Sequence, residues 1–263
     1  LGNRVENFKL IKKNIDSNLF LVAGLELVAI NSESGKINWR YELEGISDYV
    51  EIDEFNERVI ATSSVFDIEY YDFLEGSYWI FSLGGELLDS QKMDEKAWHL
   101  YSDKNGVFLG LGRPSNKILR INAENNVSLN TINSPICCGY KHIFGHANGS
   151  ISILVNDEII NEKISESAIN AIQIKNNSIL ISNEDGELFC KEKDKLKWKF
   201  EANEALVLLN CFTSKNMDFV FASTRTDDGS NLYVLNLVNG ELIFSSFSDN
   251  SIRTVTNYKN MLI

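Results

Sequence analysis

Two pairs of residues in this sequence could do chemistry: the adjacent cysteines Cys137 and Cys138, and the histidines His142 and His146. Two thiols can pair as a disulfide, and two imidazoles four residues apart on a helix can share a metal ion. On a β-strand, neighbouring side chains point to opposite faces, and residues four apart lie roughly 13 Å from each other at a rise of about 3.3 Å per residue. If these residues lie on strands, we expect reduced cysteines on opposite faces and no metal site.

Motifs of known catalytic or cofactor chemistry are missing from the chain. The sequence has no Gly-x-Ser-x-Gly nucleophile elbow, no phosphate-binding loop and no Cys-x-x-Cys pair that would indicate a zinc site. Acidic stretches at 183–187 and 226–229 resemble calcium loops only in composition, because the full ligand spacing is absent. We therefore expect no catalytic residue, no metal and no cofactor.

The charge balance restricts the partners. Asp and Glu number 37 against 25 Lys and Arg, for a net charge of -12 in 263 residues. Binding nucleic-acid phosphates needs a basic face, so the sequence argues against a nucleic-acid partner. An acidic surface instead attracts a protein or peptide with a basic patch. No apolar run approaches about 18 residues, so we expect no membrane span.

The elements that would hold a site are visible as a repeat. From Leu25 to Leu43 apolar residues alternate on both sides of a turn that contains Gly35, which predicts a hairpin of two strands. The pattern returns about every 40 residues, as in propeller repeats. The expected turn positions are Gly35, Gly85, Asn126, Asp157, Asp194 and Gly240, and Gly, Asn and Asp are the residues that a left-handed turn position favours.

Further strand-like runs precede each hairpin, for example Phe8–Lys13 with Asn18–Ala23, and Ile169–Lys175 with Ser178–Ser182. Four short strands in about 40 residues make a propeller blade. We therefore predict an all-β fold, a single β-propeller domain over residues 1–263. Six hairpins give six complete blades, and strands at 252–258 and 261–263 would begin an incomplete seventh. The chain is then a fragment of a longer one; a six-bladed propeller is the alternative.

The stretch from Ala29 to Trp39 resembles the PQQ-like, or quinoprotein-type, propeller repeat, whose pattern is Ala-x-Asp-x-x-Thr-Gly-x-x-x-Trp. Asn31 and Ser34 stand where that pattern has Asp and Thr, and weaker copies surround Trp198 and Gly240. The resemblance, shared in rhythm with WD40-like repeats, implies a propeller. Some quinone-dependent enzymes of this type carry adjacent cysteines that cover the cofactor, so a quinone-type oxidoreductase, or a sugar-acting propeller enzyme, is one alternative function.

Two repeats carry extra residues, at Val65–Tyr78 and Ser223–Asn231, between the expected second and third strands of their blades. Loops on rigid scaffolds carry function, and aromatic residues dominate interface energetics. The candidate partner-binding residues are Phe66, Asp67, Glu69, Tyr70, Tyr71, Asp72, Phe73, Tyr78, Arg225, Asp227 and Asp228. We expect both insertions to share one face, with Tyr70, Tyr71 and Phe73 supplying most of the binding energy.

These observations favour a non-enzymatic scaffold that binds a protein or peptide through one face of a propeller. A sensor domain of a larger receptor or regulator is a second alternative. Free thiols suit a reducing compartment, so we expect a cytoplasmic location. The periplasm is the alternative if a signal peptide precedes Leu1.

Overall fold

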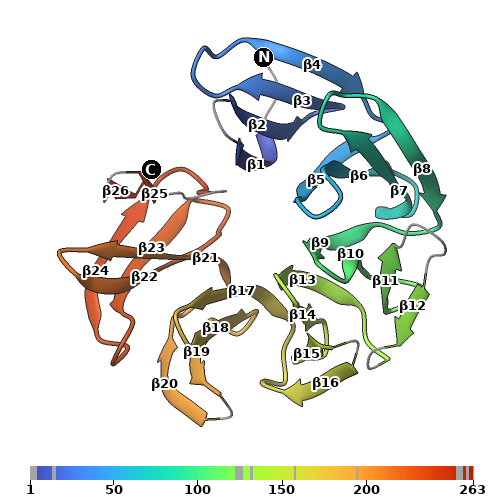
Figure 1. Ribbon diagram of the computed structural model, residues 1–263. Coiled ribbons are helices and arrows are strands. Elements are labelled where there is room, and N and C mark those ends of the chain that lie inside the picture. The colour runs from blue at the N-terminus through green and yellow to red at the C-terminus, as the bar shows by residue number, and fades with distance from the viewer. Residues whose placement is uncertain are drawn as a thin grey trace. The chain divides into compact units, whose positions relative to one another are not determined.

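The computed structural model describes residues 5–13, 16–121, 127–130, 133–156, 158–193, 195–252, 257–258 and 261–262. Every element in these ranges is a β-strand, as the alternating pattern predicts. The chain divides into two compact units, residues 1–136 and 137–263. Each unit contains four-stranded antiparallel sheets whose strands lie side by side in chain order (Figure 1).

The first unit holds three such sheets. The first sheet is β1 (Val5–Lys13), β2 (Asp16–Ala23), β3 (Glu26–Asn31) and β4 (Ile37–Glu42). The second is β5 (Ile46–Asp53), β6 (Arg58–Asp67), β7 (Asp72–Ser82) and β8 (Leu87–Met93). The third is β9 (Ala97–Asp103), β10 (Gly106–Leu111), β11 (Lys117–Ile121) and β12 (Val127–Asn130).

The second unit repeats the plan. The fourth sheet is β13 (Ile136–Tyr140), β14 (Ile143–His146), β15 (Ser150–Val155) and β16 (Glu158–Lys163). The fifth is β17 (Ile169–Lys175), β18 (Ser178–Asn183), β19 (Glu187–Glu192) and β20 (Lys195–Glu201). The sixth is β21 (Leu206–Ser214), β22 (Met217–Thr224), β23 (Ser230–Asn236) and β24 (Leu242–Ser248). A two-stranded sheet follows, β25 (Asn257–Tyr258) with β26 (Met261–Leu262).

The predicted strands and turns are confirmed where the structure describes them. The runs around Phe8, Asn18, Ile169 and Ser178 are strands β1, β2, β17 and β18. Gly35, Gly85 and Gly240 lie between the third and fourth strands of their sheets, with φ of 68°, 94° and 73°. The other expected turn residues, Asn126, Asp157 and Asp194, lie outside the described residues.

Six four-stranded sheets match the six predicted blades. Strands β25 and β26 fall where the sequence places the first strands of a seventh blade. Most of the chain around them lies outside the described residues, so the seventh blade stays a prediction.

Within each unit, neighbouring sheets bury their apolar faces against one another. In β3, Leu27 and Ala29 join a cluster with Val50 and Val59 of the second sheet, whereas Val28, on the opposite face of β3, belongs to a different cluster. Side chains that alternate along a strand thus serve the two faces of the sheet. The second unit does the same, with Leu180, Leu188, Trp198, Val220 and Leu235 in one cluster of the fifth and sixth sheets.

A tryptophan on the fourth strand joins one sheet to the next in both units. Trp39 pairs with Ala29, and Trp198 pairs with Cys190, each beside an irregularity in strand pairing. The two residues therefore occupy equivalent positions, as the copy of the repeat around Trp198 predicts. The indole N–H of Trp39 donates to the carbonyl of Leu83 (3.1 Å), and that of Trp198 donates to Leu237 (2.9 Å). Each acceptor lies in the glycine turn of the following sheet.

The turn glycines lie directly on these rings. A Cβ added to Gly85 would lie 2.7 Å from the Trp39 ring, and one added to Gly240 would lie 2.6 Å from the Trp198 ring. Phe244 occupies the same register on β24, opposite Val234, and its side chain is 54% exposed. The described residues contain no helical segment of the length and hydrophobicity that a membrane crossing requires.

The first prediction tests this contact with two turn glycines of the same unit. Gly35→Ala imposes a left-handed conformation on alanine but meets no atom within 4 Å. Its cost should be about 1–2 kcal/mol. Gly85→Ala carries the same cost and also displaces the Trp39 ring, which should add about 1–3 kcal/mol of overpacking. Urea unfolding of both variants measures the difference, and equal losses would contradict the packing described here.

Candidate partner-binding site

The hairpin of β6 and β7 extends beyond its sheet. Pairing between these strands continues from Ser64 opposite Gly76 to Asp67 opposite Asp72. Strand β8 pairs with β7 only as far as Gly76, and strand β5 pairs with β6 only as far as Ser64. Residues Val65–Glu75 therefore form a two-stranded ribbon, here called the arm. Its place between the second and third strands confirms the predicted insertion.

Large apolar side chains are exposed at the tip of the arm. Ile68 is 81% exposed, Tyr70 72% and Tyr71 83%. One carboxylate oxygen of Asp67 accepts hydrogen bonds from the backbone N–H groups of Glu69 (2.8 Å) and Tyr70 (3.1 Å), which orders the turn. Tyr71 has a φ of 55°, a left-handed conformation that a bulky residue adopts rarely.

Aromatic contacts hold the base of the arm. The ring of Phe66 lies 5.5 Å from that of Tyr71 and 5.2 Å from that of Phe73, both edge to face. Phe73 in turn lies 6.0 Å from Trp98 of β9 in a perpendicular arrangement. Such pairs contribute about 0.5–1.5 kcal/mol each beyond burial. The rings thus connect the arm to the third sheet of the same unit.

A buried ion pair lies beneath these rings. The Lys96 ammonium lies 3.8 Å from the centre of the Phe73 ring and forms an ion pair with Asp48, and both charged side chains are largely buried. Burial raises the pKa of Asp48, and the nearby Glu6 acts in the same direction, while Lys96 opposes both. Phe73 thus contacts both the Lys96 ammonium and the Trp98 ring, and these contacts attach the arm to the rest of the unit.

The structure separates the predicted residues of the arm into groups. Tyr70, Tyr71, Glu69 and Asp72 are exposed, whereas Phe73 is half-buried at the base. The prediction that Tyr78 contributes to a surface site is wrong. Tyr78 is 1% exposed, lies in the core between the second and third sheets, and donates its hydroxyl to Gln91. Its position on β7 is already inside the sheet, where alternation directs it to the core.

Sequence reasoning missed three residues of this region. Ile68 lies within the predicted insertion and is among the most exposed apolar residues. Its position between Asp67 and Glu69 was the signal in the sequence that could have indicated this exposure. Lys96 and Trp98 come from another sheet, and no spacing in the sequence links them to the arm.

The second predicted insertion is a tighter loop. Arg225, Asp227 and Asp228 are exposed between β22 and β23, where the backbone of Thr226 pairs with that of Gly229. These residues belong to the second unit. The expectation that they share a face with the arm stays a prediction.

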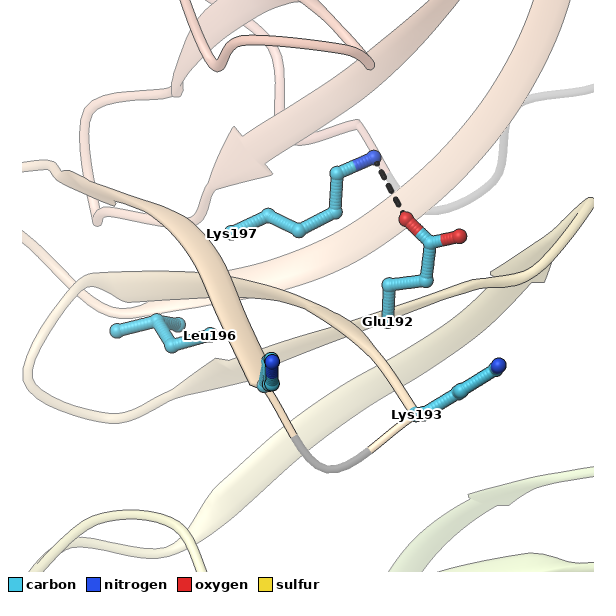
Figure 2. A pocket seen from close by; sticks show the side chains of 5 residues that line it. Glu192, Lys193, Leu196 and Lys197 are labelled. Atoms are coloured by element: carbon cyan, nitrogen blue, oxygen red, sulfur yellow. Dashed lines mark ion pairs between the residues drawn. The ribbon is translucent and has the colours of Figure 1, made fainter.

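A shallow hollow of about 500 Å³ lies on the β19–β20 hairpin (Figure 2). It is lined by Glu192, Lys193, Lys195, Leu196 and Lys197, and the Lys197 ammonium lies 3.1 Å from the Glu192 carboxylate. Sequence reasoning did not select this hairpin, although its alternating lysines were a signal. The lysines that line the hollow would attract a negatively charged group, whereas the carboxylates of the arm would attract a positively charged one.

The adjacent cysteines depart from expectation. Cys137 and Cys138 are free thiols, as predicted. The prediction that they point to opposite faces is wrong, because both sulfurs contact the carbonyl oxygen of Ile169, at 3.0 and 3.3 Å. Alternation needs a regular strand, and the corresponding first strands β17 and β21 both carry irregular pairing near their start. Within the described ranges, no three His, Cys, Asp or Glu side chains form a metal cluster.

No family model matches the sequence, and no curated protein matches it. Solved structures do resemble the fold. The Cps50 (Swd1) β-propeller domain of Myceliophteria thermophila aligns with a TM-score of 0.69 at 12% identity, over 94% of this chain and 88% of that one. BamB of Moraxella catarrhalis aligns with a TM-score of 0.65 at 14% identity, over 99% and 79% of the two chains.

BBS1N in complex with ARL6DN aligns with a TM-score of 0.65 at 8% identity, over 95% of this chain and 82% of that one. With the four-stranded sheets, these similarities show that the chain has the β-propeller fold. At such low identity they show the fold alone.

The second prediction concerns the ion pair under the arm. Lys96→Met leaves the Asp48 carboxylate buried without its counter-ion, which should lower the free energy of unfolding by about 3–5 kcal/mol near pH 7. Because burial raises the folded-state pKa of Asp48, stability from this group is fully present at low pH and is lost as the pH rises through the raised pKa.

Protonation of Asp48 should therefore return part of the lost stability in acid. We expect the deficit of Lys96→Met in urea unfolding to shrink as the pH is lowered from neutrality towards the ordinary pKa of an Asp carboxyl, because the raised pKa of Asp48 lets the folded protein take up the proton first. The double variant Asp48→Asn/Lys96→Met is the control, and its own free energy of unfolding should lack the pH dependence that Asp48 gives the single variant. A deficit of the single variant that is constant with pH would exclude the Asp48 charge as its cause.

Proposed function

We propose that this chain is a non-enzymatic β-propeller scaffold that binds a protein or peptide partner through the arm. The observation that carries the proposal is the exposure of Ile68, Tyr70 and Tyr71 at the tip of a ribbon whose base is packed on Trp98 and Lys96. A set of exposed large apolar residues on an ordered element is typical of an interaction site.

The anchoring of the arm matters for affinity. A binding element that is ordered before it meets its partner loses less conformational entropy on association. The Asp67 side chain orders the turn, and the rings of Phe66 and Phe73 order the strands. Tyrosine is also among the residues that dominate binding energy in protein interfaces. Left-handed backbone at Tyr71 supports the same reading, because such conformations gather at functional sites.

The charge of the arm indicates the kind of partner. Glu69 and Asp72 border the apolar tip, Glu75 lies at the base of the arm opposite Val65, and all three are exposed. Exposed carboxylates at the border of a contact steer an oppositely charged partner and set its register. The net charge of -12 acts in the same direction. The proposed partner therefore carries Lys or Arg around an apolar segment.

Among the solved structures of similar fold, BBS1N was crystallised in complex with ARL6DN, which supports a scaffold role by analogy only. We further propose that the repeats belong to the PQQ-like type, that the last blade is an incomplete seventh, and that the chain is cytoplasmic. The Gly35, Gly85 and Gly240 turns support the repeat type, β25 with β26 supports the seventh blade, and the four free cysteines support a reducing compartment.

The third prediction tests the arm with displayed peptides rich in Lys and Arg. Peptides selected on the wild-type protein should bind Tyr70→Ala/Tyr71→Ala more weakly by at least about 2 kcal/mol, which is about 30-fold in Kd. Calorimetry measures the affinity. The free energy of unfolding should fall by no more than about 0.5–1.5 kcal/mol, the contribution of the Phe66–Tyr71 ring pair, because both tyrosine rings are otherwise exposed.

Phe55→Ala is the matched control, because Phe55 is 68% exposed in the β5–β6 turn of the same sheet. It should leave peptide affinity unchanged. An equal loss in Phe55→Ala, or full affinity in the double variant, would remove the arm from the binding site. Phe73→Ala should instead lower the melting temperature, since Phe73 packs on Trp98 and Lys96.

The fourth prediction separates the scaffold from a quinone-type oxidoreductase. A ligand that binds only the folded state stabilises it by RT ln(1 + L/Kd), where L is the free ligand concentration, so the melting temperature rises with ligand concentration. Pyrroloquinoline quinone with Ca²⁺ should therefore leave the melting temperature and the absorbance spectrum of the cofactor unchanged. A rise in melting temperature that grows with cofactor concentration, together with a spectral shift, would support the enzyme in place of the scaffold.

A further inference from the structure

The Cys137 and Cys138 thiols converge on one point of the second unit. Cys137 Sγ lies 3.0 Å from the carbonyl oxygen of Ile169 and 3.5 Å from that of Gly145. Cys138 Sγ lies 3.3 Å from the same Ile169 oxygen. Both residues are partly buried, and the Cys138 thiol itself is buried.

The surrounding backbone makes room for this pair. Gly145 of β14 has no side chain where Cys138 Sγ lies, and an added Cβ would come within 2.6 Å of that sulfur. The same Cβ would meet the Ile169 side chain at 2.8 Å. Strands β13, β14 and β17 thus place two sulfurs together beside the Ile169 carbonyl oxygen and the Ile169 side chain.

The electrostatics of the pair favour neutral sulfur. A hydrogen bond between the two thiols, together with burial, raises the pKa of Cys138 well above its ordinary value. The carbonyl oxygens of Ile169 and Gly145 also present the negative ends of their dipoles to the sulfurs. A site for a metal cation would need both thiols as thiolates, which this setting disfavours.

We propose that Cys137 and Cys138 form a dithiol site for a monosubstituted trivalent arsenical. In the reaction R–As=O with two S–H groups, two As–S bonds form and the arsenic–oxygen bond breaks. The two thiol protons leave with the oxygen as one water molecule. Arsenic stays trivalent and sulfur keeps its oxidation state, so no oxidant or reductant takes part.

Charge and geometry both support this ligand. The product R–As(S–)₂ is neutral, so its formation places no net charge beside the carbonyl oxygens. Two adjacent residues whose sulfurs already meet at one oxygen lose little freedom when they bridge a single atom. Cys190 and Cys211 come from different sheets of this unit and lie in one apolar cluster, in which Cys190 is fully buried, so they serve as the comparison pair. The inference is independent of the arm and of the proposed function.

The fifth prediction tests the site with phenylarsine oxide and the full chain. Intact mass spectrometry should show one phenylarsenic group with two hydrogens lost, and thiol titration should fall from four reactive groups to two in the unfolded adduct. Peptide mapping should place both bonds on the Cys137–Cys138 peptide. The adduct should survive excess 2-mercaptoethanol, because a dithiol chelate resists a monothiol, and 2,3-dimercaptopropanol should remove it.

Four single variants complete the design. Cys137→Ser and Cys138→Ser should each lose the monothiol-resistant adduct, while Cys190→Ser and Cys211→Ser should keep it. Circular dichroism verifies that each variant is folded. Peptide mapping of the wild-type protein needs no variant and stands if one fails to fold. An adduct on Cys190 or Cys211, an adduct that 2-mercaptoethanol removes, or no adduct at all would overturn the proposal.

Discussion

A four-stranded antiparallel sheet in this chain has apolar side chains on both faces, and it is stable only when its neighbours cover them. The division is visible in β3, where Leu27 and Ala29 serve one cluster and Val28 another. The tryptophans at 39 and 198 add a specific contact, since each indole lies beneath the glycine turn of the next sheet and donates to a carbonyl in that turn. Within each unit, packing between neighbouring sheets therefore buries the apolar faces that strand pairing leaves uncovered.

The arm depends on this packing although it projects beyond it. A two-stranded ribbon is marginally stable in water by itself. Here its base is held through Phe73, which meets Trp98 and Lys96 of the segment that begins the next sheet. The buried Asp48 then holds Lys96 from the second sheet. The exposed tyrosines therefore lie on a ribbon whose base is attached to the core through Phe73, Lys96 and Asp48. Exposure of large side chains on an ordered element supports the proposed binding role.

Low sequence identity to other propellers has a physical explanation. The repeat constrains where apolar, turn and aromatic residues stand, and many residue types satisfy each requirement. In the sixth sheet, Phe244 occupies the position that a tryptophan has in the first and fifth sheets. In the fourth sheet, the third and fourth strands pair regularly, with Ile153 opposite Ile160, so that sheet lacks the irregularity found beside the tryptophans. Similar structures at 8%, 12% and 14% identity are consistent with this tolerance.

The sequence by itself determined the all-β class, the four-stranded unit, the positions of the glycine turns and the equivalence of Trp39 and Trp198, because alternation and turn residues are local signals. It also located the arm as an insertion. Only tertiary structure decided that Tyr78 is core while Tyr70 is exposed, and that Lys96 and Trp98 support the arm, since these contacts join separate sheets. The convergence of Cys137 and Cys138 on Ile169 likewise depends on how β13 meets β17, which no local periodicity encodes.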